Sequence, residues 1–180
     1  NVAFYACNSL ESIDLPSATS IGNQTFSNCR NLTDIGSSNV ISIGDSAFYN
    51  CTSLIDISLP SVTSMGNSTF NNCTTLTRIN LPNITSIGGG VFGGCTSLTD
   101  VNIHNATSIG GGAFTYCTSL TDINLPNVTS ISNGAFYNCT NLLDIYLPNA
   151  QNTYSNAPWG AVNATIHYEC EFDENGVPID

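Results

Sequence analysis

The sequence predicts a mainly β repeat solenoid in which coils of 22 residues stack and present one parallel β-sheet face. Phenylalanine, cysteine and leucine each recur every 22 residues, and two further apolar positions follow them in phase. This self-similarity indicates that each coil covers the apolar core of its neighbour. The phenylalanines of the pattern are Phe4, Phe26, Phe48, Phe70, Phe92, Phe114 and Phe136.

One strand is predicted in each unit, and "LTDINLP" at residues 120 to 126 shows its pattern. Because successive side chains of a strand point to opposite faces, Ile123 and Leu125 should point inward while Asp122 and Asn124 face solvent. Equivalent strands of successive coils then lie side by side. Together they form a parallel sheet.

The rest of the unit turns the chain back to the next strand. Pro126 has no N–H and suits the end of a strand, and "NVTSI" at residues 127 to 131 is a second β-favouring run. A glycine follows in most units, and we expect this bend to require a positive φ. These glycines are Gly22, Gly44, Gly66, Gly88 and Gly110.

The stretch "AFYNCTSLIDISLPSVTSMG", at residues 47 to 66, resembles the BspA-type leucine-rich repeat, a cysteine-containing class. The resemblance covers residues 1 to about 150, although the repeat is one residue shorter than the commonest form. It implies a right-handed leucine-rich-repeat coil. It also implies a non-enzymatic protein at the cell surface or outside the cell, where similar proteins resemble adhesins.

The chain divides into residues 1–150, about seven repeats with the first one incomplete, and residues 151–180, a C-terminal cap and the start of a linker. Where the phenylalanine position falls on Pro158, Trp159 stands beside it, and "ATIHYE" alternates as a strand does. A large ring there could cover the open apolar end of the stack. The start in mid-repeat suggests a fragment.

Seven of the eight cysteines occupy one position of the repeat. Equivalent positions in neighbouring coils lie about 4.8 Å apart with parallel side chains, which favours a buried, reduced ladder over disulfide pairing. Some disulfides, or a bound metal, are the alternatives. The ladder consists of Cys7, Cys29, Cys51, Cys73, Cys95, Cys117 and Cys139, and Cys170 stands outside it.

Composition excludes several classes of partner. The net charge is −11, and Arg30 and Arg78 are the only basic residues apart from two histidines, so nucleic acid and direct membrane insertion are not expected. No catalytic residues are predicted, because His104 and His167 do not recur with a fixed serine or aspartate. No C-x-x-C pair supports a zinc site.

The outward face of the predicted sheet is the candidate binding site. Its oxygens could bind a basic protein segment, sugar hydroxyls or calcium, the only cofactor considered. The alternative is a solvated face that keeps the protein soluble. Arg78 should relieve repulsion between Asp56 and Asp100. The candidate residues are Asp34, Asp56, Arg78, Asp100, Asp122, Asp144, Asn80, Asn102, Asn124 and Tyr146.

Two functions are compatible with these observations. The first is a non-enzymatic extracellular or cell-surface adhesion module that binds a protein or glycan of a host or neighbouring cell. The second is a structural stalk or filament that assembles end to end. Departures from the repeat at His104, Leu143 and Tyr146 fall at or near the strand, which favours binding because a spacer would keep its repeats interchangeable.

Overall fold

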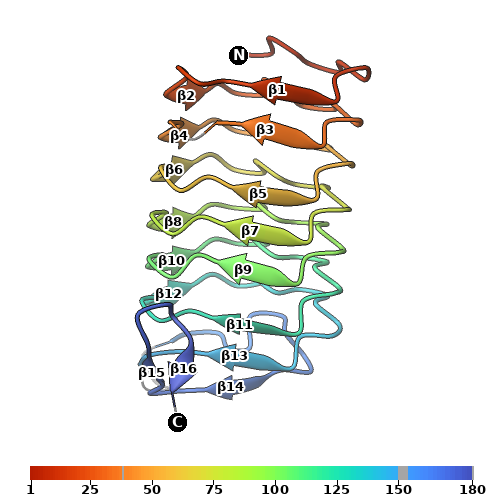
Figure 1. The fold of residues 1–180 in the computed structure, drawn as a ribbon. Helices are drawn as coiled ribbons and strands as arrows, with labels where there is room; N and C mark the ends of the chain where they lie inside the picture. Colours follow the sequence, from red (N-terminus) through yellow and green to blue (C-terminus); the bar gives the residue numbers. More distant parts are fainter. Residues whose placement is uncertain (38, 150–153, 180) are drawn as a thin grey trace.

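The chain forms a β-solenoid, as the 22-residue spacing predicts. The computed structural model describes residues 1–37, 39–149 and 154–179, and these contain no helix. Each turn carries a three-residue strand on one side and, in most turns, a two-residue strand on another (Figure 1). We call the two rows of strands the front sheet and the side sheet.

The front sheet is a row of parallel strands along the molecule, and in the described residues its hydrogen bonds divide it into three groups. Ile13 lies opposite Ile35, Ile57 opposite Ile79 and Ile123 opposite Ile145. The predicted alternation is confirmed: the middle residue of most strands is buried and the first is exposed. The strands are β1 (Ser12–Asp14), β3 (Asp34–Gly36), β5 (Asp56–Ser58), β7 (Arg78–Asn80), β9 (Asp100–Asn102), β11 (Asp122–Asn124), β13 (Asp144–Tyr146) and β14 (Thr165–His167).

The side sheet arises from the second β-favouring run of each repeat. Its serines face outward and its apolar residues, such as Ile87 and Ile109, are buried. Its strands are also parallel. They are β2 (Ser20–Ile21), β4 (Ser42–Ile43), β6 (Ser64–Met65), β8 (Ser86–Ile87), β10 (Ser108–Ile109) and β12 (Ser130–Ile131).

A continuous row of stacked rings fills the interior. Adjacent phenylalanine rings lie with their centroids 5.2 to 5.9 Å apart, from Phe4 to Phe136. The rings of Phe48, Phe70 and Phe92 are completely buried. Every internal turn therefore contributes one ring that touches the turns before and after it, and burial of such large apolar surfaces stabilises the fold.

The cysteines form a second internal row beside the rings. From Cys29 to Cys139 each Sγ donates a hydrogen bond to a phenylalanine carbonyl 25 residues earlier, at 2.9 to 3.2 Å. These six thiols are buried. Cys7, in the first turn of the given sequence, is exposed, whereas it was expected to be buried with the others.

The predicted positive φ at the bend glycines is wrong. Gly44 and Gly110 have ordinary dihedrals, whereas positive φ values occur two and six residues after each bend, for example at Ser46 and Asn50. The reason for glycine is close approach between turns. A Cβ on Gly110 would lie 2.7 Å from the carbonyl carbon of Gly88, closer than packed atoms come.

We expect Gly110→Ala to lower the free energy of unfolding by about 1–3 kcal/mol, because the added methyl group would push two turns apart. Gly111→Ala is the matched control, since its Cβ would meet nothing closer than 3.6 Å. Urea unfolding of both variants measures the difference. Equal stability of the two would contradict the steric explanation.

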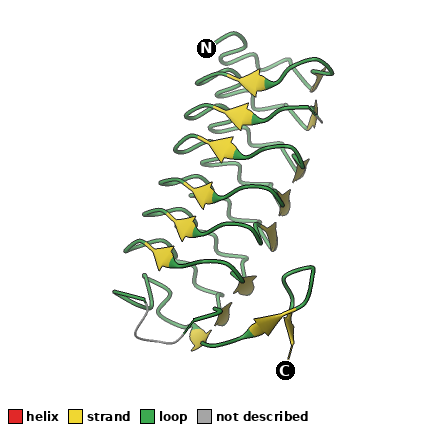
Figure 2. Cartoon of the chain, turned by 90° about the vertical axis from the view of Figure 1, so that its left-hand side faces the viewer, coloured by secondary structure: helices red, strands yellow, loops and turns green. Residues whose placement is uncertain are grey.

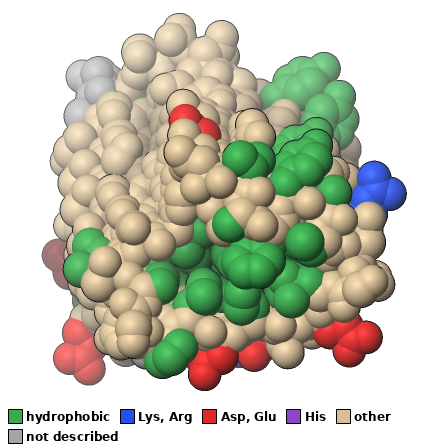
Figure 3. All heavy atoms as spheres, turned by 90° about the horizontal axis from the view of Figure 1, so that it is seen from above, with side chains coloured by type: hydrophobic (Ala, Val, Ile, Leu, Met, Phe, Trp, Pro, Cys, Tyr) green, Lys and Arg blue, Asp and Glu red, His purple; other side chains and the backbone are tan. Residues whose placement is uncertain are grey.

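The two ends of the solenoid differ. Apolar side chains gather at the N-terminal end, where Val2, Phe4 and Tyr5 are exposed (Figure 3). At the other end Trp159 is completely buried, its Nε1 donates to the Ser155 carbonyl at 2.8 Å, and its ring meets Tyr154 edge to face. Beyond it, β14 adds a further strand to the front sheet.

The tail that the sequence predicts to begin a linker forms a hairpin. Strands β15 (Glu171–Phe172) and β16 (Pro178–Ile179) pair antiparallel. The Asp173 carboxylate accepts hydrogen bonds from the backbone N–H groups of Asn175 and Val177, and Gly176 has a φ of 76°. An Asx-type turn thus folds the tail back toward earlier turns (Figures 1 and 2).

Candidate functional site

The front sheet brings the candidate residues together in two adjacent rows. The first residue of each strand gives a charged row and the third gives a mostly amide row, because both positions point away from the core. The charged row contains Asp34, Asp56, Arg78, Asp100, Asp122 and Asp144, and the amide row contains Asn80, Asn102, Asn124 and Tyr146.

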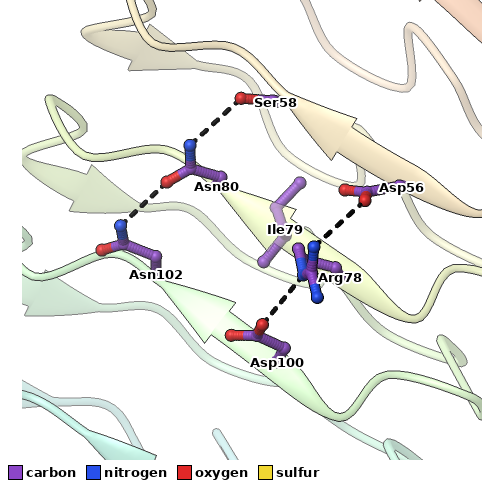
Figure 4. Close-up of a pocket in the computed structure, with 7 residues that line it drawn as sticks. All are labelled: Asp56, Ser58, Arg78, Ile79, Asn80, Asp100 and Asn102. Atoms are coloured by element: carbon purple, nitrogen blue, oxygen red, sulfur yellow. Dashed lines mark hydrogen bonds and ion pairs between the residues drawn. The ribbon is translucent and has the colours of Figure 1, made fainter.

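Arg78 sits between two carboxylates, as its position in the row predicts (Figure 4). Its Nε lies 2.9 Å from Asp100 Oδ2 and its Nη1 lies 3.5 Å from Asp56 Oδ2. All three side chains are more than half exposed, so each pair contributes little to stability, about 0–1 kcal/mol. The arrangement holds the guanidinium in one orientation on the surface.

The amide row is a chain of hydrogen bonds over three strands. Asn80 Nδ2 donates to Ser58 Oγ at 3.0 Å, and Asn102 Nδ2 donates to Asn80 Oδ1 at 2.8 Å (Figure 4). Asn102 Oδ1 lies 2.7 Å from His104 Nδ1. Because the oxygen can only accept, Nδ1 of His104 is the nitrogen that carries the proton.

The chain of amides stops at Asn124. On one side, His104 Nδ1 donates to the side-chain oxygen of Asn102. On the other side, Tyr146 stands where the next asparagine would be. Neither neighbour therefore extends the amide hydrogen bonds to Asn124. Within the described part of the chain, Asn124 Oδ1 is buried without a hydrogen-bond partner. An unsatisfied buried acceptor costs about 1–3 kcal/mol, which makes this position unusual in an otherwise satisfied row.

An aromatic pair ends the two rows. Tyr146 stacks on His167 with ring centroids 4.5 Å apart, and His167 Nε2 lies 2.8 Å from Asp144 Oδ1. His104 and His167 were not among the residues predicted for the site. The sequence marks both residues, since His104 stands where most repeats have proline and His167 follows Tyr146 by nearly one repeat.

Three open depressions lie along the front sheet. One of about 390 Å³ surrounds Arg78 and is lined by Asp56, Asp100 and Asn102 among others (Figure 4). Two more, of about 250 and 370 Å³, lie beside Asn124, where Val177 of the hairpin forms part of both. Carboxylates, amides and imidazoles there can form hydrogen bonds and ion pairs with a ligand.

The described residues contain neither a cluster of metal ligands nor a helix that could span a membrane. Among the described residues no three or more His, Cys, Asp or Glu side chains are grouped so that they could hold a metal ion. Calcium therefore stays an unsupported prediction for this face. In the described ranges no helix is long and apolar enough to cross a membrane.

The fold and the repeat define a leucine-rich-repeat solenoid. A family model described as the BspA type leucine-rich repeat region matches residues 1–107 and 63–160, and the chain belongs to this family. The resemblance stated from the sequence is thus confirmed. A comparison with curated proteins gave no match.

Solved bacterial structures share the fold. A leucine-rich repeat protein of Eubacterium ventriosum is 25% identical, with a TM-score of 0.69 over 92% of this chain and 50% of its own. One of Bacteroides ovatus is 24% identical, with a TM-score of 0.57 over 97% of this chain and 50% of its own. The T. pallidum leucine-rich repeat protein is 25% identical, with a TM-score of 0.52, and 67% of this chain and 69% of that one are covered. The chain thus spans about half the length of the first two.

Proposed function

We propose that this chain is a non-enzymatic binding module, at the cell surface or outside the cell, that recognises a protein or glycan of a host or neighbouring cell through its front sheet. Membership of the BspA-type family supports the location, because such proteins are often surface proteins. The observation that carries the proposal is the individual character of the face. Each turn contributes similar core residues, and most outward residues repeat as Asp or Asn, but Arg78, Tyr146 and His167 depart from that pattern.

Several outward positions of this face depart from the repeat. Arg78 interrupts the row of carboxylates, and Tyr146 with His167 interrupts the row of amides. Leu143, directly before β13, is 55% exposed where most turns have threonine. A spacer has no use for such differences, whereas a binding surface requires them for specificity.

The test is a screen of the purified chain against immobilised matrix proteins and a glycan array, followed by a face variant. We expect the combined change Asp100→Asn, Asp122→Asn and Asp144→Asn to weaken binding of the partner by about tenfold or more, because it removes three charges from the contact surface. Binding kinetics on the immobilised partner measure the change.

The matched control removes the same number of charges elsewhere, by Glu11→Gln, Glu169→Gln and Glu171→Gln. These three glutamates are exposed and lie outside the two rows. An unchanged affinity of the face variant, or an equal loss in the control, would remove the front sheet from consideration.

A further inference from the structure

Two adjacent glycines open a hollow in the wall of the solenoid, on the segment that connects β8 of the side sheet to β9 of the front sheet (Figure 1). These are Gly93 and Gly94, and all other repeats carry side chains at both positions. We name this depression of about 370 Å³ the glycine hollow, and its volume lies in the range of small-molecule sites. Its walls are formed by Asn71, Asn72, Thr74, Thr96, Thr115 and Tyr116.

One wall of the glycine hollow is an exposed tyrosine in a strained backbone conformation. Tyr116 has a φ of 59°, in the left-handed region that bulky residues rarely adopt. Most turns have an asparagine there, which tolerates this region better, namely Asn28, Asn50, Asn72 and Asn138. The Tyr116 ring is 49% exposed and meets the Tyr137 ring edge to face, with centroids 6.0 Å apart. Strained residues of this kind are typical of functional sites.

The polar groups of the glycine hollow are uncharged and include both donors and acceptors. Asn71 Nδ2 uses one hydrogen on the Gly90 carbonyl at 2.9 Å and keeps the other, and a Cβ on Gly93 would lie 2.6 Å from this nitrogen. Thr96 Oγ1 and Thr115 Oγ1 donate to backbone carbonyls at 3.3 and 3.1 Å, so both oxygens can still accept. Asn71, Thr96 and Thr115 are accessible to solvent, and none of the described lining residues is charged. The lining therefore suits a neutral ligand whose groups both donate and accept.

The shape of the glycine hollow fits a single six-membered ring. The turns on either side of the glycine pair are two strand spacings apart, about 9.6 Å. A pyranose sugar ring presents C–H groups on its faces, which pack against the negative face of an aromatic ring, and hydroxyl groups around its edge. We propose that the glycine hollow binds one sugar ring of a neutral saccharide, with Tyr116 against its C–H groups and with Asn71 and Thr115 bonding to its hydroxyl groups.

A second hollow on the same row of turns repeats the arrangement. Tyr5 and Tyr49 lie two turns apart on either side of the buried Ser27, and Asn28 lines the same depression of about 240 Å³. A small residue on the floor, tyrosine walls and an amide thus occur together twice. The two hollows are three turns apart, about 14 Å, so a saccharide of several units can reach both.

This site goes beyond the proposed function, because the glycine hollow shares no residue with the two rows of the front sheet. The test is an NMR titration of the ¹⁵N-labelled chain with neutral hexasaccharides: cellohexaose, laminarihexaose, maltohexaose and mannohexaose. Hexagalacturonic acid is the charged comparison. We expect at least one neutral hexasaccharide, but not the charged one, to give saturable shifts at the backbone amides of Gly93, Gly94 and Tyr116.

Two substitutions restore the residue that most turns carry and should remove the site without loss of stability. Tyr116→Asn deletes the aromatic wall, and Gly94→Asn fills the floor at a φ of 74° that asparagine tolerates. At equivalent positions Asn50 Nδ2 donates to Asn28 Oδ1 at 2.8 Å, so neighbouring turns accommodate two asparagines. Each variant should weaken saccharide binding at least about tenfold, with a midpoint of urea unfolding no lower than that of the parent chain.

The matched control is Gly111→Asn, the same substitution at an exposed glycine outside the hollow. Asparagine occupies the equivalent position at Asn23, Asn67 and Asn133, and a Cβ on Gly111 would meet nothing closer than 3.6 Å. This variant should change the affinity less than about twofold. An equal loss in the control, or unchanged affinity of Tyr116→Asn and Gly94→Asn, would overturn the inference.

Two outcomes of the titration itself would also overturn it. The first is that no neutral hexasaccharide shifts the amides of the glycine hollow, and the second is that the charged hexasaccharide shifts them equally. Binding by the front sheet is tested separately with the combined Asp100→Asn, Asp122→Asn and Asp144→Asn variant. A saccharide that loses affinity in that variant but not in Tyr116→Asn binds the front sheet, which would support the proposed function and exclude the hollow.

Discussion

Phe92→Ala should lower the free energy of unfolding by about 3–5 kcal/mol, the largest loss expected from a single substitution in this chain. The Phe92 ring is completely buried, and its centroid lies 5.9 Å from that of Phe70 and 5.3 Å from that of Phe114. Truncation leaves a cavity between two turns whose backbones are fixed by the strand ladders. The surrounding side chains cannot collapse into it. The lost transfer free energy of the ring therefore adds to the free-energy cost of the cavity.

The control is the same substitution at the end of the stack. Phe4 is 36% exposed and has only Phe26 as a ring neighbour, so Phe4→Ala should cost much less than Phe92→Ala. Urea unfolding followed by circular dichroism measures both. Similar losses at the two sites would show that stacking between internal turns does not govern stability.

The second large effect is loss of stability in alkali. Burial raises the pKa of the Cys73, Cys95 and Cys117 thiols well above the ordinary value, and in each case the next thiol of the ladder raises it further. Burial likewise raises the pKa of Cys139 to about 11. These thiols stay protonated in the folded chain at a pH where the unfolded chain has already released their protons.

The sign of the effect follows from this difference. Below the ordinary thiol pKa of about 8.5 both states are protonated and the stability is unaffected. As the pH rises, only the unfolded state ionises, so the free energy of unfolding falls by about 1.4 kcal/mol per pH unit for each shifted thiol. For the three central thiols together we expect a slope of about 4 kcal/mol per pH unit between roughly pH 9 and 11.

Urea unfolding at a series of pH values from neutral to pH 11 measures this slope. A variant with Cys73→Ser, Cys95→Ser and Cys117→Ser should lose about half of this alkali sensitivity, because a serine hydroxyl does not ionise in this range while Cys29, Cys51 and Cys139, whose pKa values burial also raises, remain. Cys7→Ser, at the exposed end of the row, should retain the steep dependence. An identical slope in the triple variant and the parent chain would mean that other groups cause the alkaline transition.

The sequence predicted the repeating part of the structure because each element there follows from local spacing. Alternation of apolar and polar residues in "LTDINLP" places Ile123 inside and Asp122 outside, and the strand pairing confirms it. The order of equivalent positions in successive repeats also placed Arg78 between Asp56 and Asp100. In a solenoid, residues one repeat apart are neighbours, so contacts between turns can be predicted from periodicity.

Features that depend on dihedral angles or on distant segments were not predicted. The positive φ positions two residues after the bend hold Gln24, Ser46 and Ser68 before glycine appears at Gly90, so residue type gives little signal there. That Asn124 lies outside the chain of amide hydrogen bonds could not be predicted, because it depends on His104 turning toward Asn102. Packing of the tail against β9 and β11 has no repeat to reveal it, because residues 171–179 occur once.

Because the contacts between successive turns are equivalent, they do not fix how many turns the solenoid has. Each cysteine from Cys29 to Cys139 bonds to a carbonyl 25 residues earlier, and each internal ring stacks on its equivalents, so a whole turn could be gained or lost by recombination without a change of register. The distance between Arg78 and the hairpin of β15 and β16 would then change in steps of one strand spacing, about 4.8 Å. The number of turns encoded in the sequence would therefore set the distance between these two parts of the surface.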